Sequence, residues 1–174
     1  HDVHPVVAVD EGGAIIENAF PGMKMPFAMV GILEKGYADV KFTAHSKGGH
    51  SSSPPNNTPI ARLSAFVNYC ETHVIFKRRM SDAALQMLKG ISTGLGGALG
   101  FITKHAKGFA PLIVKALPAI TPFGKALLGT TMTFTMAEGS KAPNVIPQSA
   151  SVVANLRFGP GDKSADCIAK LTDL

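Results

Sequence analysis

Three segments of the chain alternate apolar and polar residues with a period of two, which is typical of strands with one buried face. The segments lie at residues 37–45, 131–136 and 151–158. The apolar positions are Val40, Phe42, Ala44, Met132, Phe134, Met136, Val152, Ala154, Leu156 and Phe158. Because one face of each strand is apolar, we expect these positions to face a common core.

Two further segments place apolar residues at helical spacing. Thr58 can cap the first helix, and Pro59 can occupy its first position. A second helix is expected to begin near Asp162 or Ser164. The apolar positions are Ile60, Leu63, Phe66, Val67, Cys70 and Val74 in the first helix, and Ala165, Ile168, Ala169 and Leu171 in the second.

The order of the expected elements is strand, helix, insert, strand, strand, helix. This is the order of the split βαβ or ferredoxin-like plan, an α+β fold in which helices cover one face of an antiparallel sheet. The fourth strand of that plan would lie beyond Leu174. The insert, at about residues 81–129, is rich in Gly, Ala, Leu and Lys with scattered Pro, and it predicts two or three short helices.

A different pattern precedes residue 36. The apolar run at residues 6–9, followed by the turn Asp10 to Gly13, is typical of a buried parallel strand, and strand-like runs recur at 14–16 and 27–33. We therefore expect residues 1–35 to be a fragment of an α/β body with connecting strands. Residues 36–174 are expected to form a separate domain.

The net charge of +5 is concentrated in one segment. Between Lys77 and Lys125 there are eight basic residues and one acid, Asp82, whereas the rest of the chain carries nine basic and eleven acidic residues. A nucleic-acid surface along the whole chain is therefore not indicated. A membrane-surface role for the insert stays an alternative, although Gly and Pro interrupt any long amphipathic helix. No apolar stretch approaches the roughly 20 residues of a membrane span.

The two cysteines, Cys70 and Cys167, lack the spacing of a disulfide framework or of a cysteine zinc site. Their small number fits a reducing compartment, so we expect a cytoplasmic location. The first residues contain no basic region followed by an apolar run, and no signal peptide is expected.

Four polar residues stand where chemistry could occur, and each also has an ordinary structural explanation. Glu11 follows the first apolar run, where it could bind a metal or occupy a solvated turn. His50 lies in a loop rich in Gly and Ser, but a single loop histidine is more often only solvated. Asn144 lies among turn-forming residues. Arg157 could bind a carboxylate or simply line a polar strand face.

Four motifs in this order resemble the M20 metallopeptidase family. They are Val9-Asp10-Glu11-Gly12, Gly49-His50-Ser51-Ser52, Pro143-Asn144-Val145-Ile146-Pro147 and Leu156-Arg157-Phe158. Arg157 follows Asn144 by thirteen residues, as is usual in the family. The chain resembles the lid, or dimerisation, domain of such an enzyme. Its long insert is similar to the carboxypeptidase S and N-acyl-amino-acid hydrolase branch, called PM20D1-like.

The resemblance implies a role for each of the four residues. Glu11 matches a carboxylate ligand in a two-zinc centre, and His50 matches a lid histidine that reaches the neighbouring subunit's active site and polarises the scissile carbonyl. Asn144 and Arg157 match groups that hold the carboxylate end of the substrate. The other metal ligands and the general base would lie outside residues 1–174, so the chain alone is expected to bind no catalytic zinc and to be inactive.

The expected function is therefore that of a lid and dimerisation module in a zinc-dependent hydrolase of peptides or N-acyl amino acids, with a homodimer formed through the lid. The strand at residues 37–45 and the helix that begins at Pro59 are expected to supply the dimer contact, because an unpaired strand edge can pair with another strand. The alternative is a ferredoxin-like module that binds a small molecule or nucleic acid without catalysis. An RNA-binding sheet would need exposed aromatic residues, whereas Phe42, Phe134 and Phe158 fall on the apolar faces. The apolar residues of the insert are expected to pack against the protein itself or to cover an apolar substrate.

Overall fold

The computed structural model describes residues 13–17, 22, 23 and 25–174. The chain divides into two compact units. Residues 35–80 and 114–174 make one of them, which we call the sheet unit, and residues 1–34 and 81–113 make the other, which we call the insert unit. The strand predicted at residues 6–9 lies outside the described residues.

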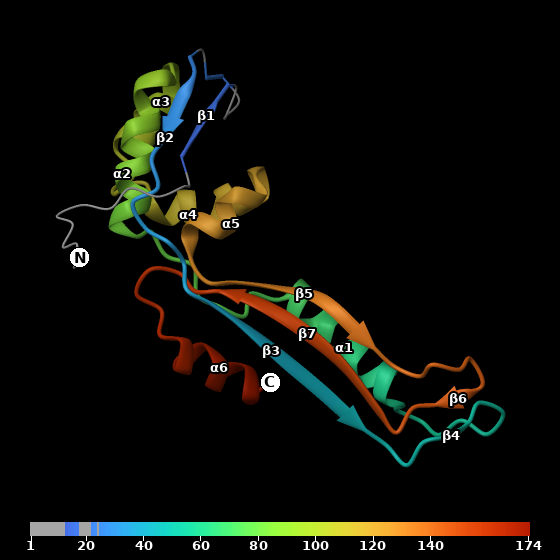
Figure 1. Ribbon diagram of the computed structural model, residues 1–174. Helices are drawn as coiled ribbons and strands as arrows, with labels where there is room; N and C mark the ends of the chain where they lie inside the picture. Colours follow the sequence, from blue (N-terminus) through green and yellow to red (C-terminus); the bar gives the residue numbers. More distant parts are fainter. Residues whose placement is uncertain (1–12, 18–21, 24) are drawn as a thin grey trace, which may run out of the picture. The chain divides into compact units, whose positions relative to one another are not determined.

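The sheet unit is built on three antiparallel strands (Figure 1). β3 (Tyr37–His45) and β5 (Thr131–Glu138) both pair with the central strand β7 (Ser149–Arg157). The register joins Tyr37 to Arg157 and His45 to Ser149. The strand order β3-β7-β5 fits the ferredoxin-like plan, and the antiparallel α+β fold predicted from the sequence is confirmed.

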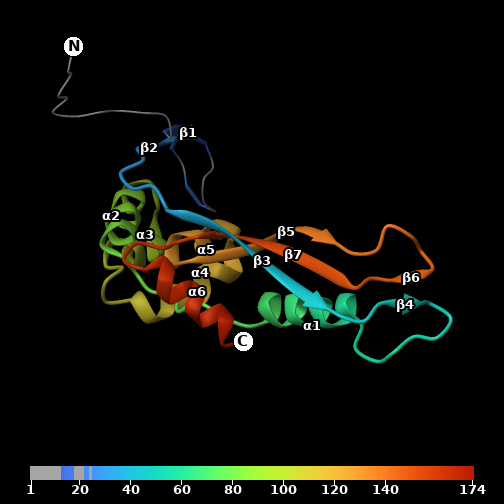
Figure 2. The ribbon, with the colours of Figure 1, turned by 60° about the horizontal axis from the view of Figure 1, so that its bottom comes forward.

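Two helices of the sheet unit, α1 (Pro59–Thr72) and α6 (Ser164–Thr172), cover the same face of the three-stranded sheet (Figure 2). α1 begins where predicted, because the Thr58 hydroxyl accepts a hydrogen bond from the Ala61 N–H at 3.4 Å. α6 follows β7. The buried residues between helices and sheet are Ala44, Leu63, Cys70, Ile75, Ala150, Val152, Ala154, Leu156, Phe158, Cys167 and Leu171.

The strand aromatics lie in this core. The Phe42 ring packs against Phe66 with centroids 4.6 Å apart and against Phe134 at 6.2 Å. Phe158 is only 8% exposed. The stacking platform that a nucleic-acid-binding sheet uses is therefore not formed by these rings.

Several residues predicted on buried faces are exposed instead. They are Met136 in β5, Ile60 in α1, Val74 after it, and Ala165, Ile168 and Ala169 in α6. β5 has a bulge between Phe134 and Met136, so Met136 stands opposite Val153 on the open face of the sheet and is 59% exposed. Val74 follows the end of α1 at Thr72 and is 63% exposed. A bulge moves every later residue of a strand to the other face, and a pattern of alternation does not reveal it.

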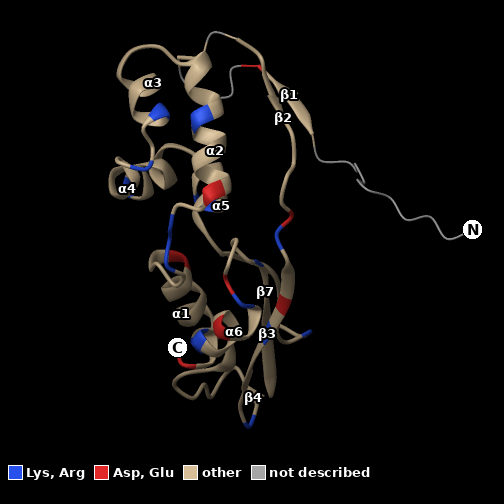
Figure 3. Cartoon of the chain, turned by 90° about the vertical axis from the view of Figure 1, so that its left-hand side faces the viewer, with Lys and Arg blue, Asp and Glu red and all other residues tan. Residues whose placement is uncertain are grey.

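The insert contains four α-helices, so the prediction of two or three was wrong. They are α2 (Asp82–Ile91), α3 (Gly97–Lys104), α4 (Ala110–Ile120) and α5 (Pro122–Leu128), with a 3-10 turn, η1 (Ser92–Gly94), after α2. Glycines separate α2 from α3, and Gly97 adopts a positive φ of 61°. Four of the eight basic residues between Lys77 and Lys125 lie in these helices, one in each, while the single acid of that stretch, Asp82, begins α2 (Figure 3). The helical cations are Lys89, Lys104, Lys115 and Lys125. No helix among the described residues is long and apolar enough to cross a membrane.

Among its described residues, the insert unit contains two short paired strands, and its most buried helix is α2. β1 (Ala14–Ile16) and β2 (Phe27–Met29) pair in antiparallel fashion. β2 is shorter than the predicted run at 27–33, and the residues after it are open to solvent. The buried residues of α2 are Ala84, Leu88 and Ile91.

The two ends of the insert meet in the sheet unit. The Arg79 N–H donates to the Leu128 carbonyl at 2.7 Å. A Cβ on Gly129 would lie 3.3 Å from the Lys77 carbonyl oxygen, so the two segments run close together. We call this pair of segments the neck of the insert.

Candidate functional site

His50 lies in the turn that contains β4 (Gly49–His50), at one end of the sheet unit (Figure 1). Two short strands form this turn, β4 and β6 (Val145–Ile146), and they pair with each other. Sequence analysis predicted only loops in both places, because two-residue strands leave no periodic pattern.

The backbone of this turn is held on both sides. The Ser46 N–H donates to the Gln148 carbonyl at 2.8 Å, and the Gly48 N–H donates to the Ser46 hydroxyl at 2.9 Å. Gly48 has a φ of +69°, and a Cβ there would lie 2.8 Å from the Gln148 side chain. Both the conformation and the space therefore require glycine at this position.

The hydrogen bonds of His50 fix which ring nitrogen can donate. The Ser52 N–H donates to Nδ1 at 3.2 Å, and the Ser52 hydroxyl lies 2.8 Å from the same atom. Because a backbone N–H can only donate, Nδ1 is the acceptor and the neutral ring carries its hydrogen on Nε2. The exposed imidazole therefore offers an N–H donor to a ligand.

Asn144 lies beside His50. Its carbonyl accepts a hydrogen bond from the Ser51 N–H at 3.0 Å, and the next residue, Val145, pairs directly with His50. Asn144 is exposed, as His50 is. The structure thus brings two of the predicted site residues together at this end of the sheet unit.

Arg157 lies at the opposite end of the sheet, as the last residue of β7. It stands on the open face, away from α1 and α6, because its neighbour Leu156 is buried in the core. β7 rises about 3.3 Å per residue, so the eight steps from Ser149 to Arg157 correspond to roughly 26 Å. Within one chain, Arg157 and the His50–Asn144 pair therefore do not converge on one small substrate.

Glu11, the predicted metal ligand, lies outside the described residues. Among the residues that are described, no group of three or more His, Cys, Asp and Glu is placed to hold a metal ion. Burial raises the pKa of both thiols, Cys70 and Cys167, so each stays protonated near neutral pH and is a poor ligand. This part of the chain does not by itself form a zinc site.

An apolar groove of about 480 Å³ runs between α1 and the edge of the sheet that β5 forms. Its apolar lining residues are Ile60, Leu63, Val67, Ala137, Ala150 and Val152. Ile60 is 49% exposed although it belongs to the predicted buried face of α1. Among the described strands β5 pairs only with β7, so the backbone groups along its outer edge have no strand partner.

A family model described as a peptidase dimerisation domain, from the M20 peptidases, matches residues 32–174. The chain belongs to the M20 peptidase family. The resemblance found in the four sequence motifs is therefore confirmed at the level of the family.

Relatives of this M20 dimerisation domain come from the branch that the insert suggested. The chain is 31% identical over 156 residues to human N-fatty-acyl-amino acid synthase/hydrolase PM20D1, a match that covers 88% of the chain and 30% of that protein. It is 33% identical over 161 residues to the probable carboxypeptidase S-like 2 of Dictyostelium discoideum, covering 92% of the chain and 30% of the relative. The chain thus spans less than a third of the length of these relatives.

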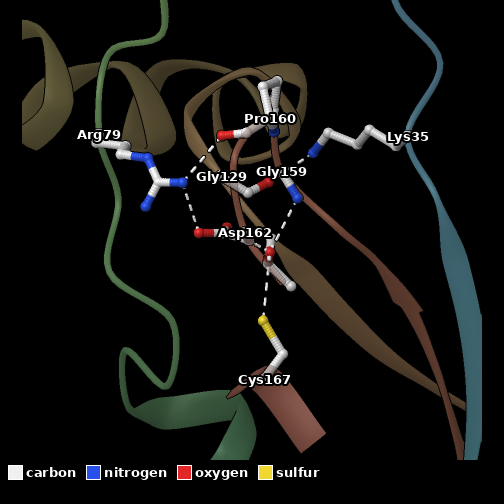
Figure 4. A network of polar contacts seen from close by, with 8 residues as sticks. Lys35, Arg79, Gly129, Gly159, Pro160, Asp162 and Cys167 are labelled. Atoms are coloured by element: carbon white, nitrogen blue, oxygen red, sulfur yellow. Dashed lines mark hydrogen bonds and ion pairs between the residues drawn. The ribbon is translucent and has the colours of Figure 1, made fainter. Parts of the chain in front are cut away.

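The M20 dimerisation domain contains a polar network that no sequence pattern indicated (Figure 4). The Thr130 hydroxyl donates to Asp162 Oδ2 at 2.6 Å and accepts from the Gly159 N–H at 2.9 Å. The Arg79 guanidinium lies 2.7 Å from Asp162 Oδ1 and donates to the Pro160 carbonyl at 2.9 Å. The network ties both sides of the neck to the loop that follows β7.

Lys35 joins the same region of the M20 domain. Its Nζ donates to the Gly129 carbonyl at 2.5 Å. Burial lowers the pKa of Lys35, and the charge of Asp162 offsets that effect in part. These contacts hold backbone segments together, so we assign the network to stability.

Thr130→Val is expected to lower the free energy of unfolding by about 1–3 kcal/mol, because Asp162 and the Gly159 N–H would lose a partner in a buried place. Thermal unfolding followed by circular dichroism measures this. Thr133→Val, at an exposed position of the same strand, is the control and is expected to leave the melting temperature almost unchanged. Equal melting temperatures for the Thr130 and Thr133 variants would contradict the assignment.

Sequence analysis missed two residues that support Arg157 in the M20 domain. Tyr37 places its ring centroid 5.2 Å from Arg157 Cζ. Asp39 Oδ1 accepts a hydrogen bond from Asn155 Nδ2 at 2.7 Å, and Asn155 Oδ1 in turn accepts one from Arg157 Nε at 3.2 Å. The two residues share the polar face of residues 37–45. Tyr37 contacts Arg157 directly and Asp39 acts through Asn155, and both arrangements depend on strand register, which the sequence alone does not provide.

Proposed function

We propose that this chain is the lid and dimerisation domain of a zinc-dependent M20 hydrolase that cleaves peptides or N-acyl amino acids, and that dimerisation completes its active site. The observation that supports this most strongly is the separation of Arg157 from His50 and Asn144 by the length of β7. Residues that bind one substrate but lie at opposite ends of a rigid sheet need a second subunit to meet.

In the proposed dimer each active site combines residues of both subunits. Arg157 comes from the subunit whose catalytic domain holds the substrate. His50 and Asn144 come from the lid of the other subunit. A two-fold axis creates two such sites in the dimer. When the subunits are apart, each site lacks the His50 and Asn144 side chains of the other lid.

Each residue has a distinct role in this site. The Arg157 guanidinium binds the substrate carboxylate, which it matches in charge and in planar geometry. The Nε2–H of His50 donates to the scissile carbonyl oxygen as negative charge develops on it, and the Asn144 amide holds the carboxylate end of the substrate. The family's metal is zinc, and Glu11 is the ligand that we propose from this chain.

The open edge of β5 and the groove beside it are the proposed dimer contact. Two copies of β5 can pair across a two-fold axis and join the two sheets edge to edge, while the apolar side chains of α1 cover the groove. Sequence analysis placed this contact on strand 37–45 together with α1. In the ferredoxin-like plan, however, the fourth strand pairs beside β3, which leaves the β5 edge for a partner.

Mixing two inactive variants of the full-length enzyme tests the composite site. At substrate concentrations well below KM, His50→Ala and Arg157→Ala are each expected to keep about a tenth of the wild-type activity or less as homodimers, because the first lowers kcat and the second raises KM. After dissociation and random reassociation of equal amounts, half of the dimers are mixed, and each mixed dimer has one intact site. The mixture should therefore recover about a quarter of the wild-type activity, as two-fold symmetry requires.

Recovery should be absent when the two substitutions are combined in one chain and mixed with either single variant at the same ratio. Hydrolysis of an N-acyl amino acid gives the readout, and native mass spectrometry confirms that mixed dimers form. Mixed dimers without recovered activity would show that both residues act within one subunit, and the proposed arrangement would be wrong.

A further inference from the structure

Arg157 stands in a row of polar side chains on the open face of the sheet. Tyr37 on β3 is the register partner of Arg157 on β7, and Asp39 is the register partner of Asn155. These two neighbouring cross-strand pairs point to the same side, because residues two apart in a strand share a face. All four side chains are thus held by the two strands that make the most extensive pairing in the domain.

Two contacts fix the plane of the Arg157 guanidinium. The Tyr37 ring lies below it, with the centroid 5.2 Å from Cζ, within the range of a cation–π interaction. Asn155 Oδ1 accepts a hydrogen bond from Nε at 3.2 Å. A long arginine side chain on an exposed strand end would otherwise sample many rotamers, and each contact removes some of them.

Asp39 determines which way the Asn155 amide faces. An ionised carboxylate can only accept hydrogen bonds, so the amide NH₂ must face Asp39, as the 2.7 Å contact between Nδ2 and Oδ1 shows. The amide oxygen then faces Arg157. Asp39 therefore orients the Arg157 guanidinium indirectly. The neutral Asn155 amide lies between the Asp39 carboxylate and the guanidinium.

We infer that Tyr37, Asn155 and Asp39 are positioning residues that present the terminal Nη edge of Arg157 to the carboxylate of the substrate. Asn155 occupies Nε, and the Tyr37 ring covers one face of the planar guanidinium. The Nη1–Nη2 edge is therefore the part of the guanidinium that a carboxylate can approach in a bidentate manner. The inference rests on the proposed carboxylate-binding role of Arg157 and adds the residues that prepare it.

The test compares an N-acyl amino acid with its C-terminal amide as substrates of the full-length enzyme. Asn155→Ala and Tyr37→Leu are each expected to raise KM for the acid about three- to tenfold, while kcat and the melting temperature stay near wild type. For the amide, which has no carboxylate, the same variants should leave KM unchanged. Tyr37→Phe keeps the ring and should restore the wild-type KM.

Asn155→Asp gives a second, independent variant. It would place a carboxylate against the guanidinium and a like charge beside Asp39, so it should raise KM for the acid more than Asn155→Ala does. Thr43→Ala, on the same face of β3 but away from Arg157, is the control and should change neither substrate's kinetics.

Three results would overturn the inference. If Arg157→Ala raises KM for the acid but Asn155→Ala and Tyr37→Leu do not, Arg157 binds the carboxylate without these supports. If the variants change acid and amide alike and lower the melting temperature, their role is structural. If Arg157→Ala itself leaves the acid and amide kinetics unaltered, the proposed role of Arg157 fails first and the inference fails with it.

Discussion

His50→Ala in the full-length enzyme is expected to lower kcat by about a hundredfold or more, the scale on which enzymes lose activity when one oxyanion donor is removed. The Ser52 N–H occupies Nδ1, so the ring can offer its Nε2–H to the carbonyl oxygen of a substrate. Alanine removes that donor. The turn itself should stay folded, because it is held by backbone and Ser46 contacts that do not involve the imidazole.

Steady-state kinetics and thermal unfolding of the same preparations check this prediction. His45→Ala is the matched control, since His45 is an exposed histidine at the end of β3, a few residues before the turn. Its kcat should be close to wild type. A folded, dimeric His50→Ala enzyme with less than a threefold loss in kcat would rule out the oxyanion role.

Arg157→Ala is expected to raise KM for a substrate with a free carboxylate by about ten- to a hundredfold, which corresponds to the loss of charge-assisted hydrogen bonds. Arg157→Lys should recover only part of this, because an ammonium keeps the charge but lacks the planar pair of donors. The melting temperature should change little, since Arg157 is exposed and its contacts lie on the open face of the sheet.

KM values for the acid and for the corresponding amide separate this effect from a general loss of binding. Lys41→Ala is the control for charge, because Lys41 is an exposed cation on the same face, 3.9 Å from Glu138. If Lys41→Ala and Arg157→Ala raise KM for the acid to the same extent, the substrate responds to the net charge of the face and not to Arg157.

The main elements of the sheet unit could be predicted from the sequence because each has one apolar face. β3, β7 and α1 were located from period-two and helical spacing, together with the Thr58 cap. The bulge in β5 could not be predicted, since it depends on the fit between two strands and not on the composition of one. The insert was harder to divide into helices, because its glycines and prolines permit several breaks.

The arrangement of the candidate site residues in space could not be predicted from the sequence either. His50, Asn144 and Arg157 were identified by resemblance, and their spacing along the chain gave no sign that Arg157 lies far from the other two. That distance follows from the length of β7 and its register. The contacts of Tyr37 and Asp39 are also products of register, which is set by the whole sheet and cannot be deduced from single residues.

The neck makes the connection between α1 and β5 a natural point of domain insertion. A backbone hydrogen bond joins Arg79 to Leu128, so the insert begins and ends at nearly the same place. The entropy of closing a loop rises only slowly with its length, so such a connection can grow or shrink during evolution at little cost to the sheet. An unrelated domain with adjacent termini could replace residues 81–127 without displacing β3, β5 or β7.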